Sequence, residues 1–148
     1  MSYEKTARSL GLSMICLDTT FVIDLWRNSA NADHPAIRFL SHHGGETCTV
    51  PAHAVGEFLE GGAVISHERY SESLAFIRKF RIGEITLETA QHYAKIVSRL
   101  RSESKLSGIS KPDIWIAAWS IEHASSLVTR NPRHFVNIEH LSVLSYDD

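Results

Sequence analysis

Three widely separated acidic residues, Asp18, Glu57 and Asp113, carry side chains that can bind a divalent cation. Carboxylates that are brought together repel one another unless a cation or protons lie between them. A site with oxygen ligands and no thiolates favours a hard ion, Mg²⁺ or Mn²⁺, over zinc. Such an ion binds a scissile phosphate, lowers the pKa of a bound water and stabilises the leaving oxygen. The three residues therefore predict phosphodiester hydrolysis, provided that folding brings them together.

Asp18 and Glu57 are associated with the first two predicted strands. Residues 14–17 form an apolar run that is typical of a buried strand, and Asp18 ends it. Residues 47–50 are predicted to form a second strand, and Glu57 lies about two turns into the helix that leaves it. Ligands of parallel α/β sheets bind at the carboxyl edge of the strands. We therefore expect both carboxylates at that edge.

Asp113 and Asn131 flank a strand in the second half of the chain. Asp113 stands at the start of a predicted helix that leads into a strand over residues 127–129, and Asn131 follows this strand closely. Because the helix runs antiparallel to the strand, its N-terminus also lies at the carboxyl edge of the sheet. We therefore expect Asp113 and Asn131 on the same side of the sheet as Asp18 and Glu57.

Short apolar strands alternate with amphipathic helices along the chain. Further strands are expected over residues 82–85 and 141–144. Helices are expected after residue 18, from Asp33 and Pro35 to Gly44-Gly45, from Pro51 to Gly61-Gly62, over residues 68–80, through 90–100 and through 114–121. This alternation predicts an α/β domain with a mainly parallel central sheet of about four to five strands flanked by helices.

Length and composition predict one globular domain. We expect the protein to lie in the cytoplasm. The 148 residues fit a single domain, and the hydrophobic fraction of 43% and charged fraction of 22% are ordinary. The apolar runs fall far short of the ~20 residues that a membrane helix needs, and no secretion signal begins the chain. We expect a domain over residues 14–148. Residues 1–13 are interpreted as a flexible N-terminal extension or as the product of an upstream start codon.

The net charge and the cysteine and histidine content give weaker evidence about partners and metal sites than the acidic residues do. The net charge of −2 does not favour a nucleic-acid partner, although an acidic active site needs basic residues only at its rim. Cys16 and Cys48 lie in apolar segments without a C-x-x-C spacing, which indicates reduced thiols and no zinc site. Of the nine histidines, His134 is a minor candidate for substrate contact, and His53 stands four residues before Glu57.

Each candidate residue also has a purely structural explanation. Asp18 is a favoured N-cap, and Ser110 with Asp113 resembles a capping box. Glu57 has the character of a solvated helix residue. Asn131, which precedes a proline, is an ordinary start of a turn. Capping and catalysis are compatible, so the functional interpretation depends on the combination of these residues.

The sequence resembles the PIN-domain family, especially its bacterial VapC-like toxins. Order and spacing agree over nearly the whole chain, and the matching segments are residues 15–25, 55–58, 111–118 and 127–135. The resemblance implies a single three-layer PIN-like domain. It also implies that Asp18 and Asp113 bind Mg²⁺ or Mn²⁺, with Glu57 as a ligand or water-orienting base, and that the substrate is single-stranded or structured RNA.

The same resemblance extends to neighbouring residues. Thr19 matches the small hydroxyl residue after the first aspartate, and Thr129 the hydroxyl residue that ends the fourth strand. We expect both to contact substrate, together with Arg130 and Lys111, which are placed to hold phosphates. Asn131 departs from the family pattern, because many relatives have a fourth acid there. Its amide oxygen can still accept a bond from water or bind a metal, but a second ion would be held more weakly.

The resemblance finally implies partners. Family members of this kind form homodimers, and toxins among them are neutralised by a cognate antitoxin that inserts a segment into the active-site groove. Two other functions stay open. Asn131 motivates a non-catalytic PIN-like module that binds RNA or protein. A phosphoryl-transfer enzyme with Asp18 as nucleophile is the third hypothesis, against which Thr20 counts, since such enzymes usually have a second acid at that position.

Overall fold

The computed structural model describes residues 14–43 and 47–146. The proposed N-terminal extension, residues 1–13, lies outside this range. So does the Gly44-Gly45 pair at which we expected the second helix to end.

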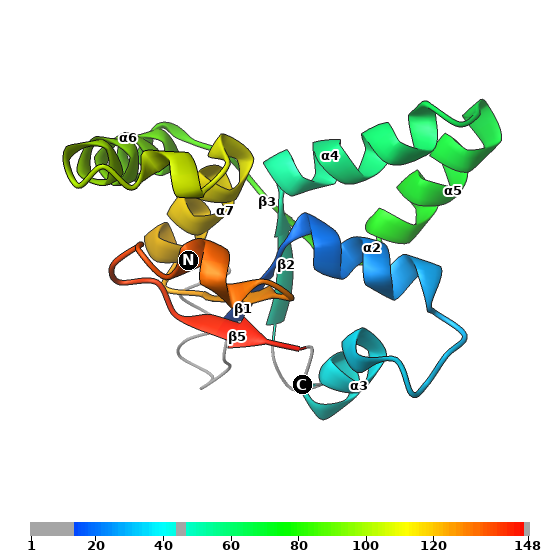
Figure 1. Cartoon of the computed structure of the whole chain (residues 1–148). Helices are drawn as coiled ribbons and strands as arrows, with labels where there is room; N and C mark the ends of the chain where they lie inside the picture. Colours follow the sequence, from blue (N-terminus) through cyan, green and yellow to red (C-terminus); the bar gives the residue numbers. More distant parts are fainter. Residues whose placement is uncertain (1–13, 44–46, 147–148) are drawn as a thin grey trace, which may run out of the picture.

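Five parallel strands form one sheet, in the order β3-β2-β1-β4-β5 (Figure 1). The strands are β1 (Met14–Leu17), β2 (Thr47–Pro51), β3 (Arg81–Gly83), β4 (Ser126–Thr129) and β5 (Val143–Ser145). The apolar β1 lies at the centre and pairs with β2 and β4. The predicted sheet is therefore confirmed, and it is parallel throughout the described residues.

Helices cover both faces of this sheet and make the predicted three-layer architecture. The longer helices are α2 (Thr19–Arg27), α3 (Pro35–His42), α4 (Ala52–Ala63), α5 (His67–Ile77), α6 (Leu87–Ser102) and α7 (Lys111–Glu122). The short 3₁₀ helices are η1 (Leu106–Gly108) and η2 (Pro132–Phe135). Figure 1 shows α6 and α7 on one side of the sheet, with α2 to α5 on the other side. The helix α3 begins at Pro35 as expected, although His34 rather than Asp33 caps it.

The helix α4 shows where the sequence interpretation was wrong. We expected it to stop at Gly61-Gly62, but it continues to Ala63. A Cβ atom on Gly62 would meet the Ser73 side chain and would lie 3.0 Å from the carbonyl oxygen of Arg69. Gly62 therefore allows α5 to pack closely against α4, and it does not end the helix.

The hydrophobic core surrounds β1 and includes Tyr146, the last residue that the structure describes. Phe21 and Tyr146 are buried and meet edge to face, with ring centroids 4.5 Å apart. Cys16 is buried and Cys48 is half-buried, and neither of these two sulfurs takes part in a disulfide. Within residues 14–43 and 47–146, no helix has the length and apolar character needed to cross a membrane.

Candidate active site

The order of strands reverses between β1 and β4. The chain adds β2 and β3 on one side of β1 and then places β4 and β5 on the other. In a parallel sheet, such a switch point opens a crevice at the carboxyl ends of the two strands. Asp18 follows β1, and its backbone N–H donates to the carbonyl oxygen of Val128 in β4 at 3.4 Å. Asp18 and the next residue of β4, Thr129, therefore stand at this switch point.

The Asp18 side chain is buried, with only 5% of the residue exposed. Its Oδ1 accepts a 2.8 Å hydrogen bond from the backbone N–H of Phe21, so the residue does cap α2. Burial raises the pKa of this carboxyl to about 6, and hydrogen bonds from the Thr129 hydroxyl and the Phe21 N–H oppose the rise. The negative charges of Asp113 and Asp24 raise it further. Asp18 is thus a capping residue within a group of acidic side chains.

Asp113 reaches the same edge from the first turn of α7. Its backbone N–H donates to Ser110 Oγ at 3.3 Å, so Ser110 caps this helix and provides one half of the expected capping box. The Asp113 side chain is 29% exposed, and His134 Nδ1 lies 3.8 Å from its Oδ2. The negative charge of Asp113 raises the pKa of Asp18. The fold has therefore brought these two carboxylates near each other, although they stand far apart in the sequence.

Glu57 is joined to this edge through Thr19. The Thr19 hydroxyl donates a 2.9 Å hydrogen bond to Glu57 Oε1, and His53 Nε2 lies 3.9 Å from the same oxygen. Thr19 directly follows Asp18, so the bond fixes Glu57 of α4 beside the start of α2. Thr19, which we expected to contact substrate, has a positioning contact with Glu57 in this structure.

Asn131, Thr129 and Lys111 complete the predicted set. The backbone N–H of Asn131 donates to Thr129 Oγ1 at 3.1 Å, and the Thr129 hydroxyl in turn donates to Asp18. Thr129 therefore links Asn131 to Asp18, although we expected it to bind substrate. Lys111 is the first residue of α7 and is exposed, two positions before Asp113.

Sequence reasoning missed a second buried acid, Asp24 of α2. Its Oδ2 accepts a 2.6 Å hydrogen bond from the Tyr146 hydroxyl and a close charge-assisted bond from Arg130 Nη2. Arg130, which we expected to hold phosphates, is therefore oriented by Asp24 and Tyr146. A signal was available: Asp24 stands three positions after Phe21 on the apolar face of the helix, where a carboxylate needs a partner.

The residues at this edge fit a hard divalent cation. Their donor atoms are carboxylate, hydroxyl and amide oxygens, as Mg²⁺ and Mn²⁺ prefer. In the part of the chain that the structure describes, no three His, Cys, Asp or Glu side chains converge on one point as a ready metal site. The acids are arranged instead as Asp18 with Asp113, and Glu57 beside them through Thr19. Such an arrangement suits an ion that is bound by few protein ligands and keeps open positions.

Comparison with known proteins identifies relatives of the fold. A family model described as the PIN domain matches residues 15–141. The structure is similar to DNA-bound VapBC from Salmonella typhimurium, with a TM-score of 0.76 and 17% identity over 91% of this chain and 98% of that chain. It resembles FitAcB from Neisseria gonorrhoeae, with a TM-score of 0.75 and 23% identity over 90% and 98% of the chains. It also resembles a toxin-antitoxin complex from Klebsiella pneumoniae, with a TM-score of 0.70 and 19% identity over 89% and 97%. No curated protein matches the sequence at a significant level.

Proposed function

Because the chain belongs to the PIN domain family, we propose that it is a divalent-metal-dependent ribonuclease with a site formed by Asp18, Glu57 and Asp113. The observation that carries this proposal is the buried Asp18 carboxylate at the switch point between β1 and β4, with the charge of Asp113 acting on it. A buried carboxylate near other acids is stabilised when a cation binds beside it.

We assign a separate role to each acid. Asp18 and Asp113 hold Mg²⁺ or Mn²⁺, which, when bound, supplies a water of lowered pKa and neutralises charge on the scissile phosphate. Glu57 acts as a further ligand or orients the attacking water. Since Thr19 donates to Glu57 Oε1, we assign the other carboxylate oxygen, Oε2, to the water. Thr129 orients Asp18 through its hydroxyl.

The substrate proposed is RNA, either single-stranded or structured. Lys111 and Arg130 adjoin the acids and are assigned to its phosphates, and the amide oxygen of Asn131 to a water or a second ion. Because Asp24 already binds the Arg130 guanidinium, which also lies over the Tyr146 ring, a phosphate would meet a side chain that has lost part of its conformational freedom.

We further propose that the protein is the toxin of a type II toxin-antitoxin system. The similar solved structures include VapBC from Salmonella typhimurium and a toxin-antitoxin complex from Klebsiella pneumoniae, which supports a cognate antitoxin for this chain. We expect a homodimer that acts on RNA in the cytoplasm. Co-expression with an antitoxin encoded by a small upstream reading frame should give a complex in which RNA cleavage is suppressed.

The direct test is a cleavage assay with the purified protein, defined RNAs and Mg²⁺ or Mn²⁺. Cleavage should require the metal and should be abolished in Asp18→Asn and Asp113→Asn. Asp33→Asn, which makes the same change at an exposed position before α3, should cleave like the wild type. Unchanged cleavage by both site variants would refute the assignment.

A non-catalytic PIN-like module that binds RNA or protein is the second candidate. The amide of Asn131 favours it, because many relatives have a fourth acid at this position. RNA binding that persists in chelator, without products after long incubation at high protein concentration, would support this alternative over the nuclease.

A further inference from the structure

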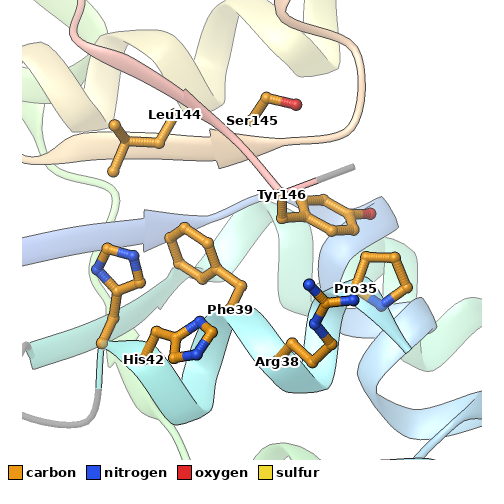
Figure 2. Close-up of a pocket in the computed structure, with 8 residues that line it drawn as sticks. Pro35, Arg38, Phe39, His42, Leu144, Ser145 and Tyr146 are labelled. Atoms are coloured by element: carbon orange, nitrogen blue, oxygen red, sulfur yellow. The ribbon is translucent and has the colours of Figure 1, made fainter. Parts of the chain in front are cut away.

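A cavity of about 300 Å³ lies between α3 and the C-terminal end of β5, outside the proposed active site. Its walls include Arg38, Phe39 and His42 of α3, His43 directly after that helix, and Ser145 and Tyr146. Figure 2 shows the Arg38 and Phe39 side chains rising from α3 toward the segment of chain that carries Ser145 and Tyr146. The cavity is large enough for a small molecule or a single nucleotide unit.

The lining of this cavity favours an anion. Arg38 supplies a positive charge, and its planar guanidinium matches the geometry of a phosphate. His42 and His43 add two imidazoles, each able to donate a hydrogen bond. None of the described residues that line the cavity is acidic.

The same walls offer aromatic faces that are held in place. The His43 ring stacks on Phe39, with centroids 4.0 Å apart and an interplanar angle of 18°. Phe39 in turn meets the buried Phe21 edge to face at 5.7 Å, and Tyr146 also meets the Phe21 ring edge to face, at 4.5 Å. Rings fixed in this way are suited to stacking on a nucleobase.

A continuous set of contacts joins the cavity to the proposed active site. The Tyr146 hydroxyl, at the cavity wall, donates to Asp24 Oδ2, which also accepts from Arg130. Arg130 directly follows Thr129, whose hydroxyl donates to Asp18. These side chains therefore link the wall of the cavity to Asp18 at the acidic edge.

We propose that this cavity is an RNA subsite that takes a phosphorylated nucleoside outside the cleaved bond, with its phosphate on Arg38 and its base against the His43 and Phe39 rings. This inference rests on the proposed function, because the RNA being cut supplies the nucleotide. A free nucleoside monophosphate has the same chemistry and is the other source to be tested.

Binding is measured in EDTA, so that no RNA is cleaved, with a labelled single-stranded RNA and with UMP and AMP as free nucleotides. Arg38→Gln removes the positive charge at an exposed position of α3. Arg78→Gln makes the same change at an exposed position at the end of α5 and serves as the control. We expect Arg38→Gln to weaken RNA binding about tenfold and Arg78→Gln to change it less than about twofold. In the cleavage assay, Arg38→Gln should raise KM and leave kcat unchanged.

The outcomes separate this inference from the function on which it rests. If RNA is cleaved and both RNA affinity and KM are the same in Arg38→Gln, the subsite is refuted and the nuclease proposal stands. If RNA is not cleaved but its binding still depends on Arg38, the subsite stands and the nuclease proposal fails. If UMP or AMP binds in an Arg38-dependent manner while RNA does not, the cavity is a free-nucleotide site, and the RNA subsite is overturned.

Discussion

The Thr19 hydroxyl donates a 2.9 Å hydrogen bond to Glu57 Oε1 and so joins the start of α2 to the middle of α4. Thr19 is the neighbour of Asp18, the acid at the end of β1. The position of Glu57 relative to Asp18 therefore depends on one side-chain contact as well as on the backbone of α4. The preceding turn of α4 contributes His53 near the same oxygen.

Thr19→Val should uncouple Glu57 from this edge. Valine keeps the shape of threonine but removes the donor, so we expect a loss of about 1 kcal/mol in unfolding free energy. We also expect a fall in kcat of about tenfold, because Glu57 is no longer held in place. Thr19→Ser retains the hydroxyl and should restore kcat. Urea denaturation and RNA cleavage rates measure the two effects, and an unchanged kcat in Thr19→Val would contradict the positioning role.

Asp18 should make the metal-free protein less stable as the pH rises. Its pKa is raised from 3.8 to about 6 in the folded protein, first by burial. A raised pKa in an acid means that stability is fully present below about pH 4 and is lost as the pH rises through about 6. The loss amounts to about 3 kcal/mol once Asp18 is ionised.

Asp18→Asn should therefore be more stable than the wild type in EDTA at pH 7.5, and the two should converge near pH 3.5. Asparagine keeps an oxygen for the Phe21 N–H while carrying no charge. Urea denaturation at both pH values tests this, with Asp33→Asn as an exposed control. A variant that is less stable than the wild type at pH 7.5 would show that the Asp18 charge is compensated within the protein.

The sequence alone predicted the strands, because hydrophobic periodicity is a local signal, and the rule that ligands bind at the carboxyl edge of parallel strands led us to expect Asp18 and Asp113 there. It did not reveal that Asp24 binds Arg130 and Tyr146, since these partners stand 106 and 122 positions away and no spacing rule connects them. The sequence likewise did not reveal the contacts that Thr19 and Thr129 make within the protein. Their hydroxyls contact Glu57 and Asp18, and only the packed structure determines which polar neighbour a hydroxyl finds.

Asn131→Asp should strengthen metal binding. The backbone of residue 131 is fixed to Thr129, and Thr129 is bound to Asp18, so a carboxylate here adds negative charge beside the proposed ligands. We expect Mg²⁺ to bind more tightly in isothermal titration calorimetry, and the protein to be less stable in EDTA, where the added charge has no counterion. Asn137→Asp, an exposed change in the loop before β5, serves as the control. Equal Mg²⁺ affinity in Asn131→Asp and the wild type would place residue 131 outside the metal site.

The adjacent glycines of α4 should respond to alanine with opposite signs. A Cβ on Gly61 meets nothing within 4 Å, so Gly61→Ala should stabilise the helix by about 0.5–1 kcal/mol through the lower backbone entropy of the unfolded chain. A Cβ on Gly62 would lie 3.0 Å from the Arg69 carbonyl oxygen of α5, and this backbone atom cannot move aside alone. Gly62→Ala should therefore cost about 1–3 kcal/mol. Thermal and urea unfolding of both variants measure the difference, and equal effects would mean that α4 and α5 do not pack as closely as the structure places them.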